Sequence, residues 1–496
     1  MGMDLQIALF SLIPVILVFI LLLKPKYKNL PPGPHPWPLI GNLPILFTNT
    51  EVPLHITLAN MARTHGPIMI LWLGTQPTVM ASTAEAAMEI LKTHDRIFSA
   101  RHIRMSFRLK HHIKYSLVWS DCTDYWKLLR KIVRTEIFSP KMLQAQSHVR
   151  EQKVAELIDF LRSKEGQVVK ISQFVFGTLL NILGNVVFSK DVFVYGDETD
   201  KGGIQNLIRE MLMIGAEPNV AEFYPSLEEL DLQGLKKKCD ERFIRVMKMW
   251  EGTVKERKAN RNEESKDMLD VLLANDFNDA QINALFLETF GPGSETSSAT
   301  IEWVIAELIK SPKEMAKVRK ELNEVVGTST IKESDLPQLP YLQACIKEAM
   351  RLHPAAPFLL PRRAAETCEV MGYTIPKNSQ VLVNAYAIGR DPKSWKDPST
   401  FWPERFLESD VDFHGAHYQF IPFGSGRRTC VGMPLATRTI PLIVGSLVHN
   451  YDFGLPGGNR PEDLKMNEML SLTLAIDPSL CVVPKARALE HHHHHH

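Results

Sequence analysis

The amino-acid sequence predicts a mainly helical protein with a minor β region, built as one domain behind an N-terminal membrane-anchor helix. Three observations support this fold class. Residues 124–273 show a mostly helical pattern of apolar and charged side chains, and further helices are expected at 279–309, 342–352 and 433–449. Runs typical of strands are few and short. The segment 7–23 carries no charged side chain.

The apolar segment 7–23 is at the short end of the lengths that span a membrane. Lys24, Lys26 and Lys28 follow it, and basic residues on that side place the rest of the chain in the cytosol. A cleaved signal peptide is the alternative, but it needs a basic N-terminal region and a small-residue cleavage site, and the sequence shows neither. We therefore expect residues 1–29 to anchor a single-pass membrane protein.

Composition limits the classes of function that the body of the chain can have. We expect this body, a single catalytic domain, to span residues 30–488; residues 489–496 are a purification tag. The proline-rich stretch 31–42 forms a stiff linker after the anchor. A formal net charge of +1 argues against a nucleic-acid-binding protein, and six scattered cysteines without a CxxC pair suit a reducing compartment.

The body begins with two short strands that are expected to form a hairpin, and a helix from Thr83 to Thr93 follows. After the long helical region, the helix expected at 279–309 contains the sequence Phe290-Gly-Pro-Gly-Ser294. A proline inside a helix removes one backbone donor and costs about 3 kcal/mol. The remaining strands are expected in "IMILWLG" (68–74), "TVMAS" (78–82), "EVMGYTIP" (369–376) and "QVLVNAYAI" (380–388).

A single cysteine lies in the glycine-rich stretch "PFGSGRRTCVG" (422–432), directly before the last long helix. A helix N-terminus and closely approaching backbone N–H groups favour the thiolate form of Cys430. Arg427 and Arg428 suit an anionic group beside the sulfur. For an isolated cysteine, a buried structural role on a glycine turn is the ordinary interpretation, and further patterns are needed to change it.

Two pairs of residues supply such patterns. Glu348 and Arg351 are three residues apart on one helix face, which alone would be an ordinary surface ion pair. Arg405, in "FWPERF", is a possible third member of that group. Trp126 and Arg130 are one helical turn apart, so that an indole donor and a cation share a face.

In this order and spacing, the motifs resemble the cytochrome P450 family of haem-thiolate monooxygenases, from the anchor to Lys485. The resemblance implies a P450 fold with a b-type haem, Cys430 as the thiolate ligand of its iron, and a buried network of Glu348, Arg351 and Arg405. It also implies that haem propionates are bound by Trp126, Arg130, Arg362 and Arg428. The signature that carries it is Phe423-x-x-Gly426-x-Arg428-x-Cys430-x-Gly432.

The resemblance also assigns the helix at 279–309 to the oxygen face of the haem. Glu295 and Thr296 match the acid–alcohol pair that delivers protons during oxygen activation. Pro292 departs from the family pattern, which has a small residue there, and the helix is expected to bulge locally. Harmless drift at an already distorted helix is one interpretation. The other is that Pro292 reshapes the wall of the pocket and disfavours the return of oxygen to the substrate.

Stretches such as "LKTHDRIFSAR" and "SLVWSDCTDYWKLLRK" resemble the plant branch of the family that acts on benzylisoquinoline alkaloids. This resemblance implies NADPH-dependent oxidation of such an alkaloid, with intramolecular C–C phenol coupling of (S)-reticuline to corytuberine as the expected reaction. The alternatives are 3'-hydroxylation of an N-methylcoclaurine-type substrate and intermolecular C–O coupling to bisbenzylisoquinolines. A non-catalytic haem-thiolate sensor is a more remote alternative.

The remaining expectations concern contacts and partners. Glu288 is two turns before Thr296, and its carboxylate is a candidate counter-ion for a protonated amine or else a structurally paired glutamate. Ala356 and Leu359 are expected beside the haem. The charges of segment 101–114 fit either substrate recognition or a solvated face. The resemblance further implies O₂ as co-substrate, the endoplasmic reticulum membrane, and an NADPH–cytochrome P450 reductase that docks near Arg427 and Lys131.

Overall fold

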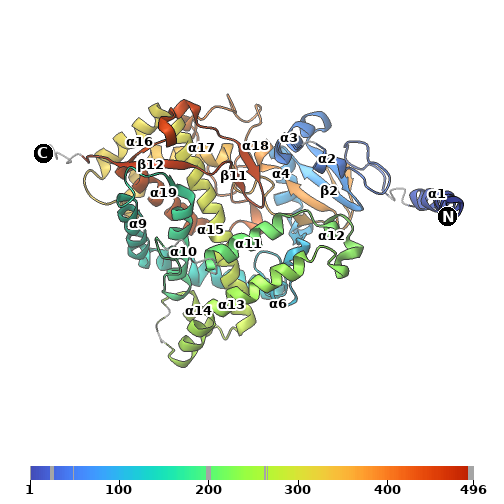
Figure 1. Cartoon of the computed structure of the whole chain (residues 1–496), viewed down its shortest axis with the longest axis horizontal. Helices are drawn as coiled ribbons and strands as arrows, with labels where there is room; N and C mark the ends of the chain where they lie inside the picture. Colours follow the sequence, from blue (N-terminus) through green and yellow to red (C-terminus); the bar gives the residue numbers. More distant parts are fainter. Residues whose placement is uncertain are drawn as a thin grey trace.

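The structure, a computed structural model, describes residues 2–22, 27–48, 50–196, 203–261, 264 and 266–489. Figure 1 shows a helical body crossed by one long helix, α15, with a separate helix α1 (Gly2–Leu22) beyond one end of the body. The mainly helical fold with a minor β region is therefore confirmed. Leu23, Lys24 and Lys26 of the expected anchor and residues 490–496 of the tag lie outside the described residues.

The central helix is α15 (Asp279–Lys310), which confirms the expected helix at 279–309. It begins at a capping box: Asn278 Oδ1 accepts the N–H of Gln281 at 2.9 Å, and Gln281 Oε1 accepts the N–H of Asn278 at 2.8 Å. Its second half is almost entirely buried because other helices surround it. This helix therefore runs through the interior of the body from one side to the other.

The local bulge expected at Pro292 is not seen, and residues 279–310 form one uninterrupted α-helix. Hydroxyl groups on the next turn add hydrogen bonds to the carbonyls of this region. Ser294 Oγ donates to the Phe290 carbonyl, and Thr296 Oγ1 donates to the Pro292 carbonyl at 2.7 Å. Neither bond replaces the missing N–H of Pro292, whose helical acceptor would be the Glu288 carbonyl, and the helix nevertheless stays regular.

The main hydrophobic core packs around α15, with the closest association between α15 and α10. Trp303 on α15 is fully buried in this core. The helices of eight or more residues that build the body with α15 are α3 (Leu54–His65), α7 (Asp124–Ile132), α9 (Ser147–Arg162), α10 (Ile171–Phe188), α11 (Ile204–Ala216), α13 (Leu235–Ala259), α16 (Pro312–Val325), α17 (Pro340–Leu352) and α19 (Met433–Asn450).

The main sheet lies at the end of the body nearest α1 (Figure 1). The expected hairpin of its first two strands is confirmed, with Ile68 opposite Ala81. Farther across the sheet, the antiparallel register sets Arg101 directly opposite Arg362. The strand order is β1 (Ile68–Leu73), β2 (Gln76–Ala81), β8 (Gln380–Val383), β5 (Arg362–Arg363) and β3 (Ala100–Arg101).

The strand expected at 380–388 is only half correct. Strand β8 ends at Val383, and Ala385–Ile388 form the short helix α18. Asn384 causes the change because its Oδ1 accepts the N–H of Ala387 at 3.0 Å and so caps the helix. The smaller sheets pair β4 (Val169–Lys170), β12 (Cys481–Ala486) and β9 (Tyr451–Gly454), β6 (Cys368–Val370) with β7 (Tyr373–Ile375), and β10 (Glu468–Leu470) with β11 (Leu474–Ile476).

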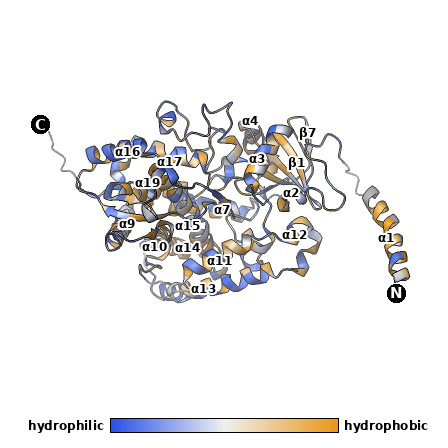
Figure 2. Cartoon of the chain, turned by 45° about the horizontal axis from the view of Figure 1, so that its top comes forward, coloured by the Kyte–Doolittle hydropathy of each residue, from blue (hydrophilic) through white to orange (hydrophobic). Residues whose placement is uncertain are grey.

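Two helices are apolar and long enough to cross a membrane, by length and composition, among the described residues. The window Ile171–Phe188 is α10, and most of it is buried in the core. The window Gly2–Phe19 belongs to α1, whose described side chains are exposed and mostly hydrophobic (Figure 2). Of these two, α1 is the helix that presents an apolar surface that a bilayer can cover.

We predict that a chain starting at Lys28 folds as the full chain does and is more soluble without detergent, because α1 stands apart from the body. Melting temperature and solubility measure this. A second truncation, starting at Leu43, is the control. It removes the Asn29 and Pro32 carbonyls, which accept the N–H groups of Thr374 and Ile70 at 2.8 and 2.9 Å, and its melting temperature should fall. A lower melting temperature for the Lys28 chain itself would show that α1 belongs to the fold.

Candidate active site

Cys430 lies in a tight loop that joins a short 3-10 turn, Gly426–Arg428, to helix α19. Its N–H donates to the Phe423 carbonyl at 2.9 Å. Gly426 has φ +74°, and a Cβ atom there would lie 2.8 Å from the carbonyl oxygen of Leu91. The loop therefore needs glycine at this position, both for its backbone conformation and for its contact with the neighbouring chain segment.

The Cys430 side chain is exposed, yet surrounding protein atoms raise the pKa of its thiol by desolvation. The backbone N–H groups of Gly432 and Met433 and the charge of Arg130 act in the opposite direction and lower this pKa. A side chain can be both accessible and desolvated when it faces an internal cavity instead of the outer surface. The sulfur is thus available to a ligand from inside the body, and nearby donors stabilise its thiolate.

Helix α15 also carries accessible groups within the body. Pro292 is exposed and Thr296 is half-buried, although the second half of the helix is enclosed. The two residues are four positions apart and so lie on one face of the helix. Of the predicted site, Pro292 and Thr296 therefore lie close together because both belong to the same face of one helix.

Glu295 points to a partner that sequence analysis missed. Burial raises the pKa of Glu295, and the charge of Arg209 on α11 lowers it. The guanidinium of Arg209 also lies over the ring of Phe176, 4.8 Å from its centroid. No sequence motif joins Arg209 to Glu295, because the two helices meet only in the folded chain.

Four arginines cluster beside the cysteine loop: Arg101, Arg130, Arg362 and Arg428. Desolvation lowers the pKa of each, and that of Arg362 falls to about 10. Their charges also repel one another: Arg362 and Arg428 lower the pKa of Arg101 further. Arg101 was not predicted, and the register of β3 against β5 is what places it beside Arg362.

Backbone carbonyls hold the guanidinium groups of this cluster. Arg130 donates to the Thr429 carbonyl at 2.6 Å, and Arg362 to the Phe98 carbonyl at 3.3 Å. Arg428 Nε donates to the Ser99 carbonyl at 2.8 Å. Neutral carbonyls orient these cations but do not cancel their charge. The cluster is therefore suited to bind a ligand with more than one anionic group.

Trp126 differs from its expected role as a donor to that ligand. Its indole N–H donates to the Leu117 carbonyl at 2.8 Å. The guanidinium carbons of Arg428 and Arg130 instead lie 4.7 and 5.5 Å from its ring centroid. Trp126 thus holds two cations of the cluster by cation–π contacts, while its N–H serves the neighbouring loop.

Glu348, Arg351 and Arg405 form the buried network that the resemblance implied. The side chains of Glu348 and Arg351 are 0% exposed, so the pair is not a surface ion pair. Arg351 Nε donates to Glu348 Oε1 at 2.9 Å, and Arg405 Nε lies 3.0 Å from Glu348 Oε2. Arg351 also donates to the Gly389 and Pro398 carbonyls at 2.7 and 2.6 Å. These bonds join α17 to the chain segment that precedes the cysteine loop.

The structure gives Glu288 other partners than a substrate amine. Its side chain is 6% exposed, and its carboxylate accepts the hydroxyl of Ser116 and the N–H groups of Leu117 and Val118. Burial nevertheless raises the pKa of Glu288 to about 7. The expectation of an open counter-ion is therefore corrected, because loop donors already occupy both carboxylate oxygens.

The remaining residues that the sequence analysis named lie in the turn after α17, in segment 101–114 and on the surface near the cysteine loop. Ala356 and Leu359 lie half-buried in the turn between α17 and β5, and Leu359 has φ +51°, a strained conformation for a side chain with a Cβ. Segment 101–114 contains several buried side chains, among them His102 and His112, so it is not a solvated face. Lys131 is exposed, while Arg427 Nε lies 2.7 Å from Asp95 Oδ2.

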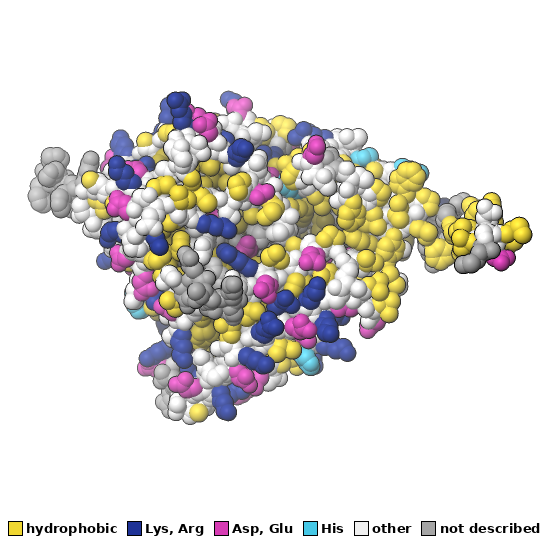
Figure 3. Space-filling view, in the orientation of Figure 1, with side chains coloured by type: hydrophobic (Ala, Val, Ile, Leu, Met, Phe, Trp, Pro, Cys, Tyr) yellow, Lys and Arg dark blue, Asp and Glu magenta, His cyan; other side chains and the backbone are white. Residues whose placement is uncertain are grey.

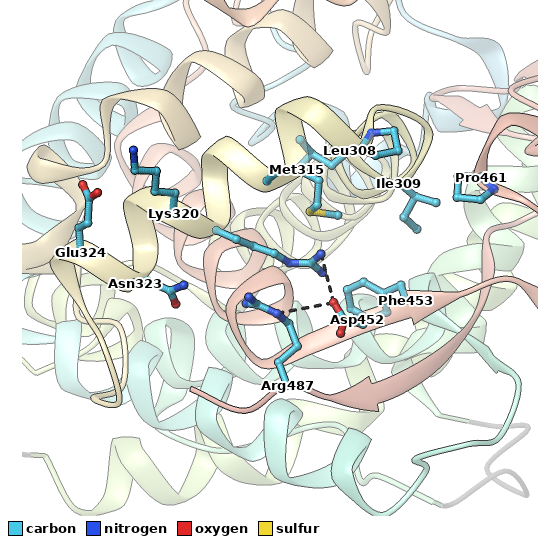
Figure 4. A pocket seen from close by; sticks show the side chains of 13 residues that line it. Leu308, Ile309, Met315, Lys320, Asn323, Glu324, Asp452, Phe453, Pro461 and Arg487 are labelled. Atoms are coloured by element: carbon cyan, nitrogen blue, oxygen red, sulfur yellow. Dashed lines mark ion pairs between the residues drawn. The ribbon is translucent and has the colours of Figure 1, made fainter. Parts of the chain in front are cut away.

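A separate surface pocket of about 650 Å³ lies between α15, α16, β9 and β12 (Figure 4). None of the candidate site residues lines it. Its charged groups serve the fold: Arg319 and Arg487 lie 3.2 and 3.6 Å from Asp452, and both donate to the Val448 carbonyl near the end of α19. These arginines thus cap a helix C-terminus.

Comparisons with known proteins agree with this geometry. A cytochrome P450 family model matches residues 31–481. The chain belongs to the cytochrome P450 family. It is 53% identical over 486 residues to berbamunine synthase from Berberis stolonifera, covering 98% of this chain and all of the relative. It is 51% identical to a probable (S)-N-methylcoclaurine 3'-hydroxylase from Coptis japonica, covering 98% of this chain and 99% of the relative.

A solved structure shares the fold. A zebra fish cytochrome P450 determined with progesterone superposes with a TM-score of 0.75 at 26% identity, covering 88% of this chain and all of that chain. Members of the family carry a haem whose iron is bound by a cysteine thiolate, and NADPH electrons reach it through a reductase. The residues present fit such a group, since an inward-facing thiol lies beside a cluster of buried cations that can take two propionates.

We predict that Cys430→His abolishes the red-shifted Soret band of the reduced carbon-monoxide complex, because imidazole replaces the thiolate as the donor to iron. A reduced carbon-monoxide difference spectrum measures this. Cys122→Ser is the control, since Cys122 is another thiol near the arginine cluster and should leave the band in place. An unshifted band in the parent protein, or a retained one in Cys430→His, would contradict the assignment.

We also predict a pH effect from Glu302, a buried glutamate on α15 whose pKa burial raises to about 7. Between pH 4.5 and 7 the folded chain binds this proton more strongly than the unfolded chain, so this group lowers stability as pH rises. Glu302→Gln removes the effect. Its free energy of unfolding relative to the parent should increase by about 1.4 kcal/mol per pH unit across this window.

Urea unfolding at several pH values measures that difference. The comparison with the parent is necessary because burial lowers the pKa of His112 to about 4, which has the opposite effect on stability in the same window. Both proteins contain His112, so its contribution cancels. A difference that stays constant between pH 5 and 7 would show that Glu302 is ionised throughout in the folded chain.

Proposed function

We propose that this protein is an NADPH-dependent haem-thiolate oxidase of benzylisoquinoline alkaloids, and that it couples the two phenol rings of (S)-reticuline to form corytuberine. The similarity to berbamunine synthase and to (S)-N-methylcoclaurine 3'-hydroxylases supports the substrate class. The observation that carries the choice of coupling is the proline at 292, one helical turn before the retained pair Glu295 and Thr296.

The roles of individual residues follow from the site. When bound, the haem activates dioxygen, with the thiolate of Cys430 donating electron density to its iron. Arg130, Arg362 and Arg428 bind its propionates, and Trp126 supports them through its ring. Ala356 and Leu359 border the substrate from the turn after α17. These assignments are supported by the inward position of Cys430 and by the excess of buried positive charge beside it.

Proton handling is assigned to Thr296 and Glu295. The hydroxyl of Thr296 donates to the Pro292 carbonyl at 2.7 Å, so its lone pairs remain free to accept a proton at Oγ1. Burial raises the pKa of Glu295, and the charge of Arg209 lowers it. An acid and a hydroxyl at neighbouring positions of α15 are the two kinds of group that proton transfer uses.

Pro292 is assigned to the outcome of the reaction. It lies on the same face of α15 as Thr296, and its ring is exposed within the body. The ring fills space that a small residue would leave open beside the Thr296 hydroxyl, and it offers no N–H. We infer that this narrows the approach by which an oxygen atom reaches a substrate carbon. Coupling has no need of that approach.

The proposed reaction balances without oxygen insertion. Each phenol of reticuline loses one hydrogen atom, the two ring radicals form one C–C bond, and transfer of the two ring protons to the phenol oxygens restores aromaticity and both hydroxyl groups. Reticuline therefore loses two hydrogen atoms overall. The two hydrogen atoms from reticuline, two electrons and a proton from NADPH, and a second proton from solvent together reduce O₂ to two molecules of water. The protein residues contribute substrate folding and protons.

Two alternatives keep some support. The similarity to 3'-hydroxylases is nearly as strong as the similarity to berbamunine synthase, at 51% and 53% identity, so identity alone does not separate hydroxylation from coupling. Intermolecular C–O coupling uses the same hydrogen abstraction and differs in how two substrate molecules pack. A non-catalytic haem-thiolate sensor would not need Glu295 and Thr296.

The membrane and the reductase complete the proposal. Residues 1–29 anchor the catalytic domain, residues 30–488, to the cytosolic face of the endoplasmic reticulum. Exposed hydrophobic side chains gather on the end of the body nearest α1 (Figure 3). They come from two segments that touch through Phe47 and Phe223, and they are Trp37, Leu39, Ile40, Phe47, Val220, Leu230 and Leu232. An NADPH–cytochrome P450 reductase docks on the cysteine side, where Lys131 is exposed.

We predict that the parent enzyme, with reductase and NADPH, converts reticuline to a product lighter by two hydrogen atoms and without added oxygen. Pro292→Ala restores an N–H and removes the ring, so it should lose coupling or form some product heavier by one oxygen atom. Mass spectrometry of the products measures both outcomes. Hydroxylation by the parent would overturn the coupling proposal. Parental coupling by Pro292→Ala would show that substrate folding alone decides the outcome.

A further inference from the structure

The carboxylate of Glu288 is bound by a loop that lies between α6 (Lys110–Ile113) and α7. The loop comprises residues 116–120. The N–H groups of Leu117 and Val118 each donate to Glu288 Oε2 at 3.1 Å, and the Ser116 hydroxyl donates to Oε1. The same Ser116 oxygen accepts the N–H of Trp119 at 2.7 Å. The Glu288 side chain on α15 therefore binds three hydrogen-bond donors of this loop.

The carbonyl groups of the same loop serve the cationic cluster. The Val118 carbonyl accepts Arg101 Nε at 3.0 Å. The Ser120 carbonyl accepts Arg428 at 2.5 Å, and the Leu117 carbonyl accepts the indole N–H of Trp126 at 2.8 Å. Within one peptide unit the C=O of a residue and the N–H of the next residue are fixed in one plane. The Val118 N–H on Glu288 therefore fixes the direction of the Leu117 carbonyl, which also accepts Arg428 at 3.4 Å, and the Trp119 N–H on Ser116 fixes that of the Val118 carbonyl.

We propose that Glu288 is a positioning residue for the haem-propionate site, which acts through the 116–120 loop on Arg101, Arg428 and Trp126. In its ionised form Glu288 can accept several hydrogen bonds and has no donor to conflict with the loop N–H groups, and these donors and the charge of Arg428 favour that form against the effect of burial. His112 Nε2 lies 3.5 Å from Glu288 Oε1, but burial lowers the pKa of His112 to about 4, so the imidazole is neutral at pH 7. The loop donors are therefore the main partners of the charge.

This role does not depend on the alkaloid. It connects the helix that borders the substrate to the groups that hold the cofactor, and the connection exists before any substrate binds. If Glu288 served as the counter-ion of a protonated amine, its carboxylate would have to break its hydrogen bonds to the 116–120 loop. A positioning residue keeps these bonds. Its replacement changes the order of the loop and the retention of haem, and leaves the selectivity between charged and neutral ligands unchanged.

Glu288→Gln is the test, and Glu302→Gln is the matched control. Both positions are buried glutamates on α15 with a pKa raised to about 7, but Ser172 and Leu480, rather than the 116–120 loop, donate to Glu302. Two measurements on the substrate-free holoenzyme apply: amide hydrogen exchange of a peptide that covers 116–120, and the rate of haem transfer to apomyoglobin. The side-chain amide that Glu288→Gln introduces would face the loop N–H groups with only one acceptor oxygen.

For Glu288→Gln we expect at least tenfold faster exchange at Leu117 and Val118, and faster haem transfer, because local opening frees both faces of the loop. Glu302→Gln should change neither. Unchanged exchange in Glu288→Gln would overturn the proposal, and so would faster exchange with an unchanged rate of haem transfer. If Glu288→Gln does not accumulate as holoenzyme, Ser116→Ala replaces it, and the same two results decide. None of these outcomes depends on whether reticuline is the substrate.

Discussion

Four guanidinium groups lie together beside the cysteine loop, three of them buried and that of Arg130 half-buried, and much of the surrounding structure is arranged to make this possible. Taking a cation out of water is expensive unless other groups replace its hydration. Here carbonyls from several separate segments do so: the turn before β3 supplies those of Phe98 and Ser99, the 116–120 loop supplies Val118 and Ser120, and the cysteine loop supplies Thr429. Asp95, Asp121 and Glu288 act on Arg362 and Arg428 through their charges, and the remaining positive charge is available to an anionic ligand such as a haem propionate.

The helix α15 meets a different constraint. It is apolar enough to pass through the core, and one of its turns carries the polar side chains to which the proposed function assigns proton transfer. Its second half is buried around Trp303, while Thr296 keeps its hydroxyl bonded to the helix itself. Pro292 lies in an unbroken helix, and its side chain is exposed instead of packed against a neighbour.

The secondary structure was largely predictable, and its errors have local causes. The strand expected at 369–376 is a hairpin of β6 and β7, which turns at Met371 and Gly372, both with positive φ. Helices such as α15 and α19 have long apolar periodicity and began and ended within one residue of their predictions. The stretch 380–388 is apolar over most of its length, and periodicity alone could not show that Asn384 would end the strand and cap a helix. The bulge expected at Pro292 came from the resemblance, and in this chain residues 279–310 form one regular helix instead.

Local motifs were sufficient for the family, and they led to the predictions for the cysteine loop and the acid–alcohol pair, since each depends on residues that are close in the chain. The partners of charged side chains could not be predicted from local motifs. Arg101 meets Arg362 through a strand register that joins segments far apart in the chain. Glu288 meets the 116–120 loop across 170 or more positions. A buried charge takes the partners that packing brings to it, and only the tertiary structure decides which these are.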